Sequence, residues 1–251
     1  MTQTTAIVLA AGKGTRMKSD LPKVLFPVLG RPMIQWVLDA LRAAGVDRIV
    51  VVVGYRADLV RETLAGQSDV EFALQEQQLG TGHAVQMCRD ALATGDGPVL
   101  VVAGDSPLIQ SSSVRELREA FEAGKYACLL GTLLKENPFG LGRIVRDANG
   151  HFERIVEQKD ATADEQAIRE VNMSTYLFER SSLLWALDQL KNENAQQEYY
   201  LTDCPALLRS RGGRVDALAT LKACESLSIN TIDELQLVES KMKELGYPCA
   251  S

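Results

Sequence analysis

The chain has 251 residues, of which 46% are hydrophobic and 24% charged, and its net charge at pH 7 is −6. This length and composition are typical of one sizeable α/β domain or two small ones. The acidic balance argues against a nucleic-acid partner bound through a basic surface. Because no apolar run approaches the roughly 20 residues that cross a bilayer, and the N-terminus lacks a secretory pattern, we expect a cytoplasmic protein with no membrane partner.

The first predicted strand, residues 6–11, is short and apolar throughout, as in a strand buried on both faces of a parallel sheet. It ends at residues 12–14, G-K-G, where two glycines allow a tight turn and a close approach of backbone to a ligand. Arg16 and Lys23 follow within a dozen residues. Backbone N–H groups with cations nearby suit a polyphosphate, although a plain structural turn fits this pattern equally well.

The spacing of these glycines excludes two common nucleotide-binding motifs. Counted from Gly12, Met17 stands where a P-loop or a G-x-G-x-x-G dinucleotide fingerprint requires its next glycine. The spacing therefore argues against a P-loop protein and against a dinucleotide-dependent oxidoreductase.

Predicted helices and strands alternate along the first half of the chain. The predicted helices are a segment that begins at Pro32 and is capped by Gly45, residues 58–64 and residues 82–93. The predicted strands are residues 48–54, 70–74 and 98–103. This alternation predicts an α/β fold with a Rossmann-like, doubly wound and mostly parallel sheet.

Strands predominate from residue 125 onward, with turn residues between them. The strand-like segments are residues 127–134, 143–147, 152–157, 171–178 and 214–221. Further helices are predicted at residues 181–191, 200–211 and 231–245. This change predicts a mixed or antiparallel extension that closes over the sheet.

Two segments in the first half carry candidate chemistry. Asp105 follows the strand at 98–103, and ligands of open parallel sheets bind beyond the carboxyl ends of the strands. Its carboxylate could hold Mg²⁺ against phosphate oxygens or cap the turn before a helix. Residues 75–84, Q-E-Q-Q-L-G-T-G-H-A, offer amides that could match a pyrimidine edge, with Gly80 and Gly82 admitting a base or ribose; a polar loop is the alternative. We expect His83, which has no nucleophile beside it, to be structural.

Taken together, the motifs resemble those of sugar-1-phosphate nucleotidyltransferases, in collinear order from about residue 4 to residue 240. The segment L-G-T-G-H-A resembles the N-acetylglucosamine-1-phosphate uridylyltransferases in particular, the uridylyltransferase half of a bifunctional bacterial enzyme. The segments that carry the resemblance are L-A-A-G-K-G-T-R-M at 9–17, L-P-K at 21–23, L-G-T-G-H-A at 79–84, G-D-S-P at 104–107, P-F-G-L-G-R-I at 138–144, I-V-E-Q-K-D at 155–160, V-N-M-S at 171–174, N-A-Q-Q-E-Y-Y-L-T-D at 194–203 and I-N-T at 229–231.

The resemblance implies an enzyme of cell-wall precursor synthesis that transfers the uridylyl group of UTP to N-acetylglucosamine 1-phosphate. It implies that Arg16 stabilises the leaving pyrophosphate and that Lys23 bridges the attacking phosphate and the α-phosphate. Asp105 and Asn230 would hold Mg²⁺, although Asn230 could instead cap the last helix. The implied nucleotide-binding residues are Leu9, Ala10, Ala11, Gly12, Gly14, Gln75, Gln78, Gly80 and Thr81, and the implied sugar-phosphate-binding residues are Gly142, Glu157 and Asn172.

The resemblance also implies how the chain is divided. Residues 1–251 are expected to form one nucleotidyltransferase domain, with a nucleotide-binding part at 1–124, a sugar-binding part at 125–228 and a C-terminal helix within 229–251. The sequence contains no hexapeptide-repeat acetyltransferase domain, and it leaves the oligomeric state open.

Two local departures from the family pattern keep other functions under consideration. Ala103 stands where a larger residue often precedes G-D, and V-N-M-S at 171–174 replaces the more usual I-N-T-G or I-N-S-G. The alternatives are a nucleotidyltransferase for another sugar 1-phosphate, such as glucose 1-phosphate with UTP or dTTP, and a non-catalytic nucleotide-sugar sensor.

Overall fold

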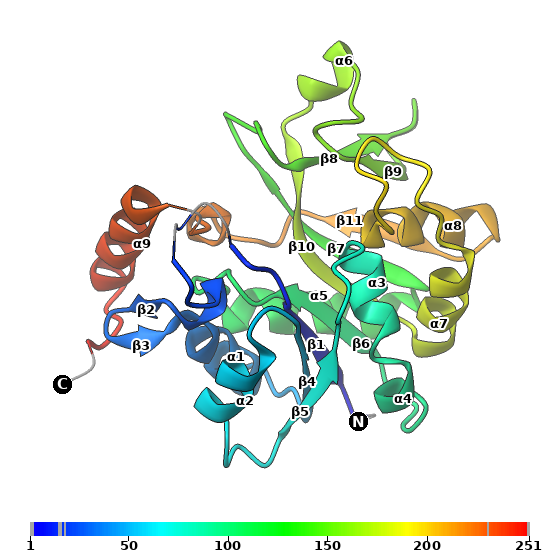
Figure 1. Ribbon diagram of the computed structural model, residues 1–251. Helices are drawn as coiled ribbons and strands as arrows, with labels where there is room; N and C mark the ends of the chain where they lie inside the picture. The colour runs from blue at the N-terminus through cyan, green and yellow to red at the C-terminus, as the bar shows by residue number, and fades with distance from the viewer. Residues whose placement is uncertain (1–2, 15–16, 18, 230, 250–251) are drawn as a thin grey trace.

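The fold is described by a computed structural model that covers residues 3–14, 17, 19–229 and 231–249 (Figure 1). Over these residues the main sheet has nine strands, which are β1 Thr5–Ala10, β4 Arg48–Val53, β5 Val70–Leu74, β6 Val99–Ala103, β7 Cys128–Leu134, β8 Gly142–Arg146, β9 Phe152–Val156, β10 Glu170–Phe178 and β11 Val215–Leu218. A separate two-stranded sheet pairs β2 Pro27–Val28 with β3 Arg31–Pro32.

The main sheet has the order β11-β7-β10-β6-β1-β4-β5, and the hairpin β8–β9 branches from β10. Strand β1 pairs in parallel with β4 and β6, and β4 pairs in parallel with β5. Strand β10 is antiparallel to both of its neighbours, β6 and β7. The predicted mostly parallel sheet is therefore confirmed, with one antiparallel strand inserted near its centre.

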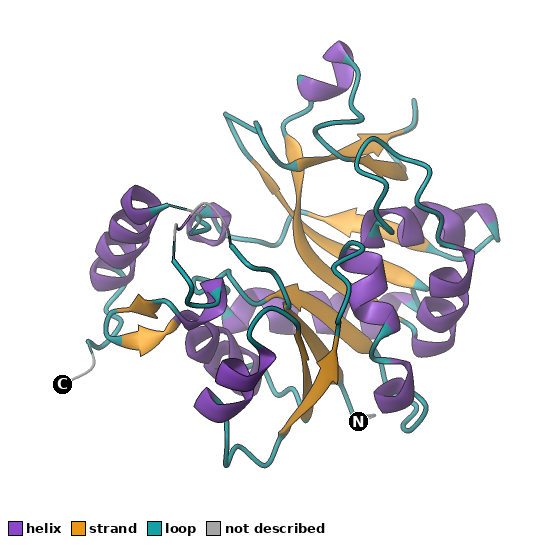
Figure 2. Cartoon of the chain, in the orientation of Figure 1, coloured by secondary structure: helices purple, strands orange, loops and turns teal. Residues whose placement is uncertain are grey.

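Helices cover both faces of the main sheet (Figure 2). The helices are α1 Met33–Ala43, α2 Ala57–Thr63, α3 Thr81–Gln86, α4 Arg89–Leu92, α5 Ser111–Gly124, α6 Ala163–Gln166, α7 Arg180–Gln189, α8 Cys204–Ser210 and α9 Ile232–Glu244. Helices α1, α2 and α5 pack into one hydrophobic core, and α3, α7 and α8 pack into another. None of the helices in the described part of the chain is long and apolar enough to cross a membrane.

The two cores explain why β1 is apolar along its whole length. The side chain of Ile7 enters the core that contains α3 and α7, whereas Ala6 and Val8 enter the core that contains α1 and α5. Alternate side chains of a strand point to opposite faces, so a strand covered on both faces needs apolar residues at every position.

The structure differs from the predicted elements in several places. The segment predicted as one helix at 82–93 forms α3 and α4, because the amide of Cys88 bonds to the carbonyl of Val85, three residues back, and the helical ladder breaks there. Helix α5 was not predicted. The extension does not simply close over the sheet, since β7, β10 and β11 are strands of that same sheet and only β8–β9 and α6 project from it (Figure 1).

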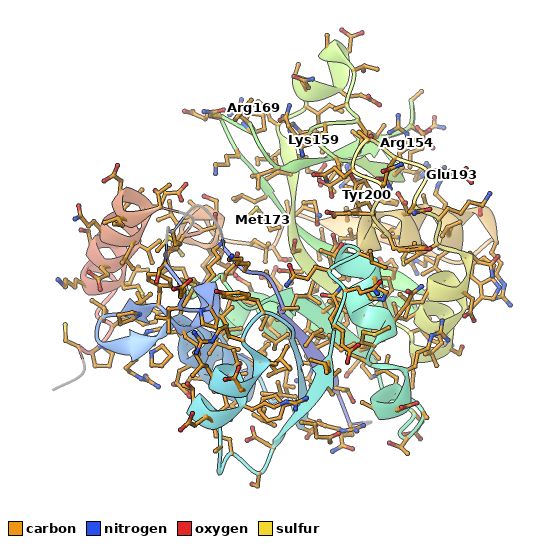
Figure 3. The ribbon with its side chains drawn as sticks, in the orientation of Figure 1. Arg154, Lys159, Arg169, Met173, Glu193 and Tyr200 are labelled. Carbon is orange, nitrogen blue, oxygen red and sulfur yellow. The ribbon has the colours of Figure 1, made fainter. Side chains whose placement is uncertain are left out.

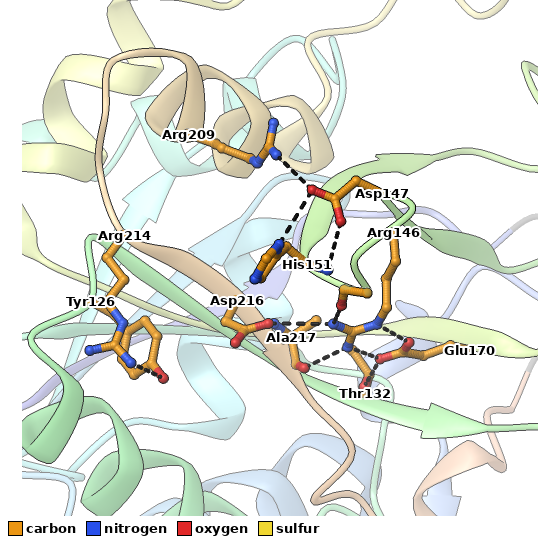
Figure 4. Close-up of polar contacts among 11 residues, drawn as sticks. Tyr126, Thr132, Arg146, Asp147, His151, Glu170, Arg209, Arg214, Asp216 and Ala217 are labelled. Carbon is orange, nitrogen blue, oxygen red and sulfur yellow. Dashed lines mark hydrogen bonds and ion pairs between the residues drawn. The ribbon is translucent and has the colours of Figure 1, made fainter.

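The projecting hairpin is fastened to the main sheet by Arg146 of β8 (Figure 4). Its guanidinium forms two hydrogen bonds of 2.7 Å with the carboxylate of Glu170 on β10. It also donates to the carbonyl of Ala217 on β11 at 2.7 Å, while Thr132 of β7 donates to Glu170 at 2.8 Å. Four strands are thus joined through one bidentate ion pair.

Candidate active site

The candidate site lies at the carboxyl ends of β1 and β6, where two turns meet. The amide of Gly104, after β6, donates to the carbonyl of Leu9 on β1 at 2.9 Å. Gly14 has a φ of +66°, and a Cβ atom at this position would lie 2.6 Å from the Cβ of Lys23. A glycine is therefore required where the loop after β1 turns back against Lys23.

Lys23 begins a short 3₁₀ helix, Lys23–Leu25, that follows this loop. Its Nζ lies 2.5 Å from Oδ2 of Asp105, in the turn after β6, and the two side chains are 13% and 31% exposed. The catalytic lysine and the metal-binding aspartate of the predicted site are thus adjacent, with opposite charges at one edge of the sheet.

A cavity of about 440 Å³, here termed the central cavity, is lined by both residues of this pair. Its lining is Leu9, Ala10, Gly12, Gly14, Lys23, Val24, Thr81, Ala103, Asp105 and Ser174. A second cavity of about 260 Å³, the side cavity, is lined by Leu9, Ala11, Gly12, Gln75, Gln78, Gly80, Thr81, Ala84 and Glu198. The two share Leu9, Gly12 and Thr81, and every predicted nucleotide-binding residue lines one of them.

The amide nitrogens of both glutamines in the side cavity are held by the protein. Nε2 of Gln75 donates to the carbonyl of Gly80 at 3.0 Å, and Nε2 of Gln78 donates to the carbonyl of Ala11 at 2.7 Å. These bonds fix the two side chains between the loop after β1 and the start of α3.

Gly80, just before α3, and Gly82, in its first turn, allow the backbone of a distant segment to pack closely against them. A Cβ on Gly80 would lie 2.6 Å from the carbonyl oxygen of Tyr199, and one on Gly82 would lie 2.9 Å from the same atom. That carbonyl accepts from the amide of Gly82 at 2.7 Å, and the amide of Tyr199 donates to Leu79 at 2.8 Å. The segment around Tyr199 is therefore hydrogen-bonded along the loop that borders the side cavity.

A third cavity of about 570 Å³, the outer cavity, extends from Asp105 toward α9. It shares Ala103, Asp105 and Ser174 with the central cavity. Its further lining comes from Ser106, Lys135, Phe139, Gly140, Leu141, Asn172, Met173, Ser226, Leu227, Ser228, Glu234, Leu237 and Val238. A ligand with two linked parts could therefore occupy both cavities and pass Asp105.

The three predicted sugar-phosphate residues lie together but do not all line this outer cavity. Asn172 pairs with Gly142 across β10 and β8, and a Cβ on Gly142 would lie 3.6 Å from Oε2 of Glu157. Glu157 lines a separate cavity of about 330 Å³ and accepts a 3.1 Å hydrogen bond from the hydroxyl of Thr202. Burial raises the pKa of the Glu157 carboxyl above its ordinary value, since a charged group is less favourable away from water.

A residue that sequence reasoning did not assign, Ser174, lies where the central and outer cavities meet. It belongs to an irregularity of β10 between Asn172 and Thr175, and its φ is +52°. The Asn172 side chain holds this bulge, because its oxygen accepts from the amide of Ser174 at 3.2 Å and its nitrogen donates to Tyr176 at 2.6 Å. The sequence feature that could have indicated this bulge was the departure from the family pattern at V-N-M-S, residues 171–174.

Figure 3 shows Met173 of this bulge and Tyr200 on opposite sides of β10, in agreement with their different cavities. Two predicted residues, the catalytic Arg16 and the metal-binding Asn230, lie outside the described residues. Among the residues that are described, no three or more His, Cys, Asp or Glu side chains form a group that could hold a metal ion.

The fold and the glycine-rich site define a nucleotidyltransferase type of protein, and comparison with known families agrees. Residues 6–199 match the MobA-like NTP transferase domain, so the chain belongs to that family. The bifunctional protein GlmU of Streptococcus suis is 46% identical over 97% of this chain and 53% of its own length. The bifunctional protein GlmU of Geobacter metallireducens is 48% identical over 94% of this chain and 49% of its own length.

The chain thus spans about half the length of the curated relatives it matches. A crystal structure from Bacillus anthracis, of a protein provisionally assigned as a glucose-1-phosphate thymidylyltransferase and bound to a sucrose, superposes with a TM-score of 0.79. The alignment covers 98% of this chain and 97% of that one at 19% identity, so it shows a common fold.

Proposed function

We propose that this chain transfers the uridylyl group of UTP to N-acetylglucosamine 1-phosphate, giving UDP-N-acetylglucosamine and pyrophosphate. The observation that carries this proposal is the Lys23–Asp105 pair at the border between the cavity lined by the glycine-rich loop and the outer cavity. The similarity to GlmU proteins and the sequence motifs favour uridine and the N-acetylated sugar.

In this proposal an oxygen of the sugar phosphate attacks the α-phosphorus of UTP. The new P–O bond forms as the bond from the α-phosphorus to the bridging oxygen breaks, and pyrophosphate leaves with that electron pair. Lys23 would contact both the attacking phosphate and the α-phosphate, and Arg16 would bind the leaving pyrophosphate. Since both reactants are anions, catalysis rests on holding them together and neutralising their charge.

Mg²⁺ is the proposed cofactor, with Asp105 and Asn230 as its protein ligands. The carboxylate of Asp105 is a hard oxygen donor that lines both the central and the outer cavity. A site with few protein carboxylates fits Mg²⁺, which usually keeps several waters and takes further ligands from phosphates. When bound, the ion would neutralise negative charge on the nucleotide phosphates.

We also propose that different parts of the chain bind the two substrates. Residues 1–124 would bind the nucleotide, and residues 125–228 would bind the sugar. Helix α9 would close the far wall of the outer cavity, which Val238 and Leu237 line. Gly142, Glu157 and Asn172 would form the sugar-phosphate site, with Asn172 acting partly through the bulge it holds.

The proposal is tested by pyrophosphate release with Mg²⁺, pairing UTP, dTTP, CTP or ATP with N-acetylglucosamine 1-phosphate or glucose 1-phosphate. Turnover confined to UTP with the N-acetylated sugar is expected. Turnover with glucose 1-phosphate, or with dTTP, would support nucleotidyl transfer but reject the proposed substrate specificity. If the protein releases no pyrophosphate but still binds UTP, the alternative function of a non-catalytic nucleotide-sugar sensor would be favoured.

The metal assignment has its own test in Asp105→Asn, which removes the charge and keeps the shape of the side chain. We expect this variant to remain folded and to need a higher Mg²⁺ concentration for half-maximal turnover. Direct Mn²⁺ binding, followed by electron paramagnetic resonance in the presence of UTP, should weaken in parallel. An unchanged metal titration in both measurements would remove Asp105 from the metal site.

A further inference from the structure

Gln75 is a buried side chain at the wall of the side cavity, and both hydrogens of its amide have partners. The residue follows β5 and is 3% exposed. Its Nε2 donates to the carbonyl of Gly80 at 3.0 Å and lies 3.0 Å from Nδ1 of His83. The two atoms beside Nε2 thus account for both N–H groups of the amide.

These neighbours fix which end of the Gln75 amide faces which way. A backbone carbonyl can only accept, so the Gly80 oxygen requires Nε2, and not Oε1, on its side. His83 Nδ1 must then accept the second hydrogen, which places the imidazole proton on Nε2 of His83. The ring is held in the first turn of α3, in contact range of Tyr199, with the ring centroids 6.4 Å apart.

With the amide in this orientation, Oε1 is the atom of Gln75 that can contact a ligand. Its Oε1 receives no hydrogen bond from the described residues, and the side chain lines the side cavity. This oxygen is an acceptor, so a ligand must present a donor to it. Uracil and thymine carry a ring N3–H, whereas N3 of cytosine carries a lone pair that would repel the oxygen.

We propose that His83 is a positioning residue for base selection: by accepting from Gln75 Nε2, it holds Gln75 Oε1 toward the ring N–H of an imide base. The inference rests on the proposed function and names the feature of the base that this site reads. It gives a role to a histidine that sequence reasoning took to be only structural. The principle is that a buried polar group left unpaired by the wrong ligand costs affinity.

The test measures binding rather than turnover. Affinities for UTP, CTP and N3-methyl-UTP, each with Mg²⁺, are determined by calorimetry for the wild type and for His83→Ala and His83→Asn. The oxygen of an asparagine side chain lies close to where Nδ1 of histidine lies, so His83→Asn keeps the acceptor. His151→Ala, which removes the chain's other histidine at an exposed site, is the matched control.

We expect the wild type to prefer UTP over both other nucleotides. In His83→Ala the ratio of UTP to CTP affinity should fall about fivefold, the effect of one hydrogen bond, and His83→Asn should recover most of it. Equal weakening of UTP and CTP in His83→Ala would overturn the inference, as would wild-type binding of N3-methyl-UTP as tight as that of UTP. The comparison of UTP with N3-methyl-UTP uses the wild type alone, so it tests the inference even if His83→Ala does not fold.

The same measurements separate this inference from the proposed function. Loss of the base preference in His83→Ala, from a wild type that releases no pyrophosphate with any sugar phosphate, would support the inference and reject the function. If the protein turns over UTP and N-acetylglucosamine 1-phosphate but His83→Ala leaves the base preference unchanged, the function is supported and the inference is rejected.

Discussion

The ammonium of Lys23 and the carboxylate of Asp105 lie 2.5 Å apart although 82 residues separate them in sequence. The pairing follows from the sheet, because β1 and β6 are parallel neighbours and the loops after them leave the same edge. In the proposed reaction this contact is replaced when the substrates bind. Lys23 would then contact phosphate oxygens, and Asp105 would bind Mg²⁺.

Lys23→Ala should lower turnover by about 100-fold or more, the usual effect of removing a charge that stabilises the transition state. The unfolding temperature should change by only a few degrees, because a pair with partly exposed side chains contributes about 1 kcal/mol or less. Lys243→Ala, on the exposed side of α9, is the control for loss of a lysine. Near-wild-type turnover of Lys23→Ala would remove this residue from the mechanism.

Gly12 and Gly14 should respond differently to alanine. A Cβ at Gly12 meets nothing within 4 Å, so Gly12→Ala should fold normally. It should weaken the proposed nucleotide binding, since Gly12 lines both the central and the side cavity. At Gly14 a Cβ meets Lys23 at 2.6 Å and φ is +66°. Gly14→Ala should therefore cost about 1–3 kcal/mol in the free energy of unfolding. Urea unfolding and UTP calorimetry distinguish the two effects, and equal stability of both variants would contradict the account.

Ser174 stores backbone strain at the junction of two cavities. A non-glycine residue at a φ of +52° is unfavourable, so Ser174→Gly should raise the free energy of unfolding by about 1 kcal/mol, whereas Ser174→Ala should not. Because Ser174 lines both cavities, loss of its hydroxyl in Ser174→Ala should raise KM for the sugar phosphate. Indistinguishable urea midpoints for the two variants would show that no strain is relieved.

The raised pKa of Glu157 predicts a pH dependence of stability. Burial makes the charged carboxylate unfavourable in the folded state, so its contribution destabilises above the raised folded pKa and disappears below the ordinary unfolded pKa. Glu157→Gln keeps the acceptor for Thr202 and should raise the unfolding temperature at pH 7 by a few degrees, the effect of about 1 kcal/mol. The gain should vanish toward pH 4, and the exposed control Glu122→Gln should show no comparable gain at either pH. A gain equal at both pH values would refute the burial argument.

Local apolar patterns made most of the fold predictable. The strand at 70–74 has the predicted bounds, β4 and β6 each differ from prediction by one residue at one end, and β1 is displaced by one residue. The continuous apolar runs of β1, β4 and β6 are typical of strands buried on both faces. The antiparallel insertion of β10 between β6 and β7 could not be predicted in this way, since strand order depends on contacts far apart in sequence.

The sequence motifs predicted many of the residues that line the cavities, but not how distant segments of the chain pack against those cavities. All nine predicted nucleotide-binding residues line the central or the side cavity. The contact of Gly80 and Gly82 with Tyr199, and the bulge that exposes Ser174, depend on packing of distant segments. The lone His83 gave no sequence signal of its partner, because its contact with Gln75 exists only once α3 is folded beside β5.

The proposed attack of the sugar phosphate on the α-phosphorus of UTP can be followed by isotope labelling. N-acetylglucosamine 1-phosphate with oxygen-18 in its phosphate is incubated with UTP, Mg²⁺ and the protein, and the products are examined by mass spectrometry. If this attack occurs, the UDP-N-acetylglucosamine retains the label in the phosphate beside the sugar, and the pyrophosphate carries none. Label in pyrophosphate, or pyrophosphate release without any UDP-sugar, would contradict it.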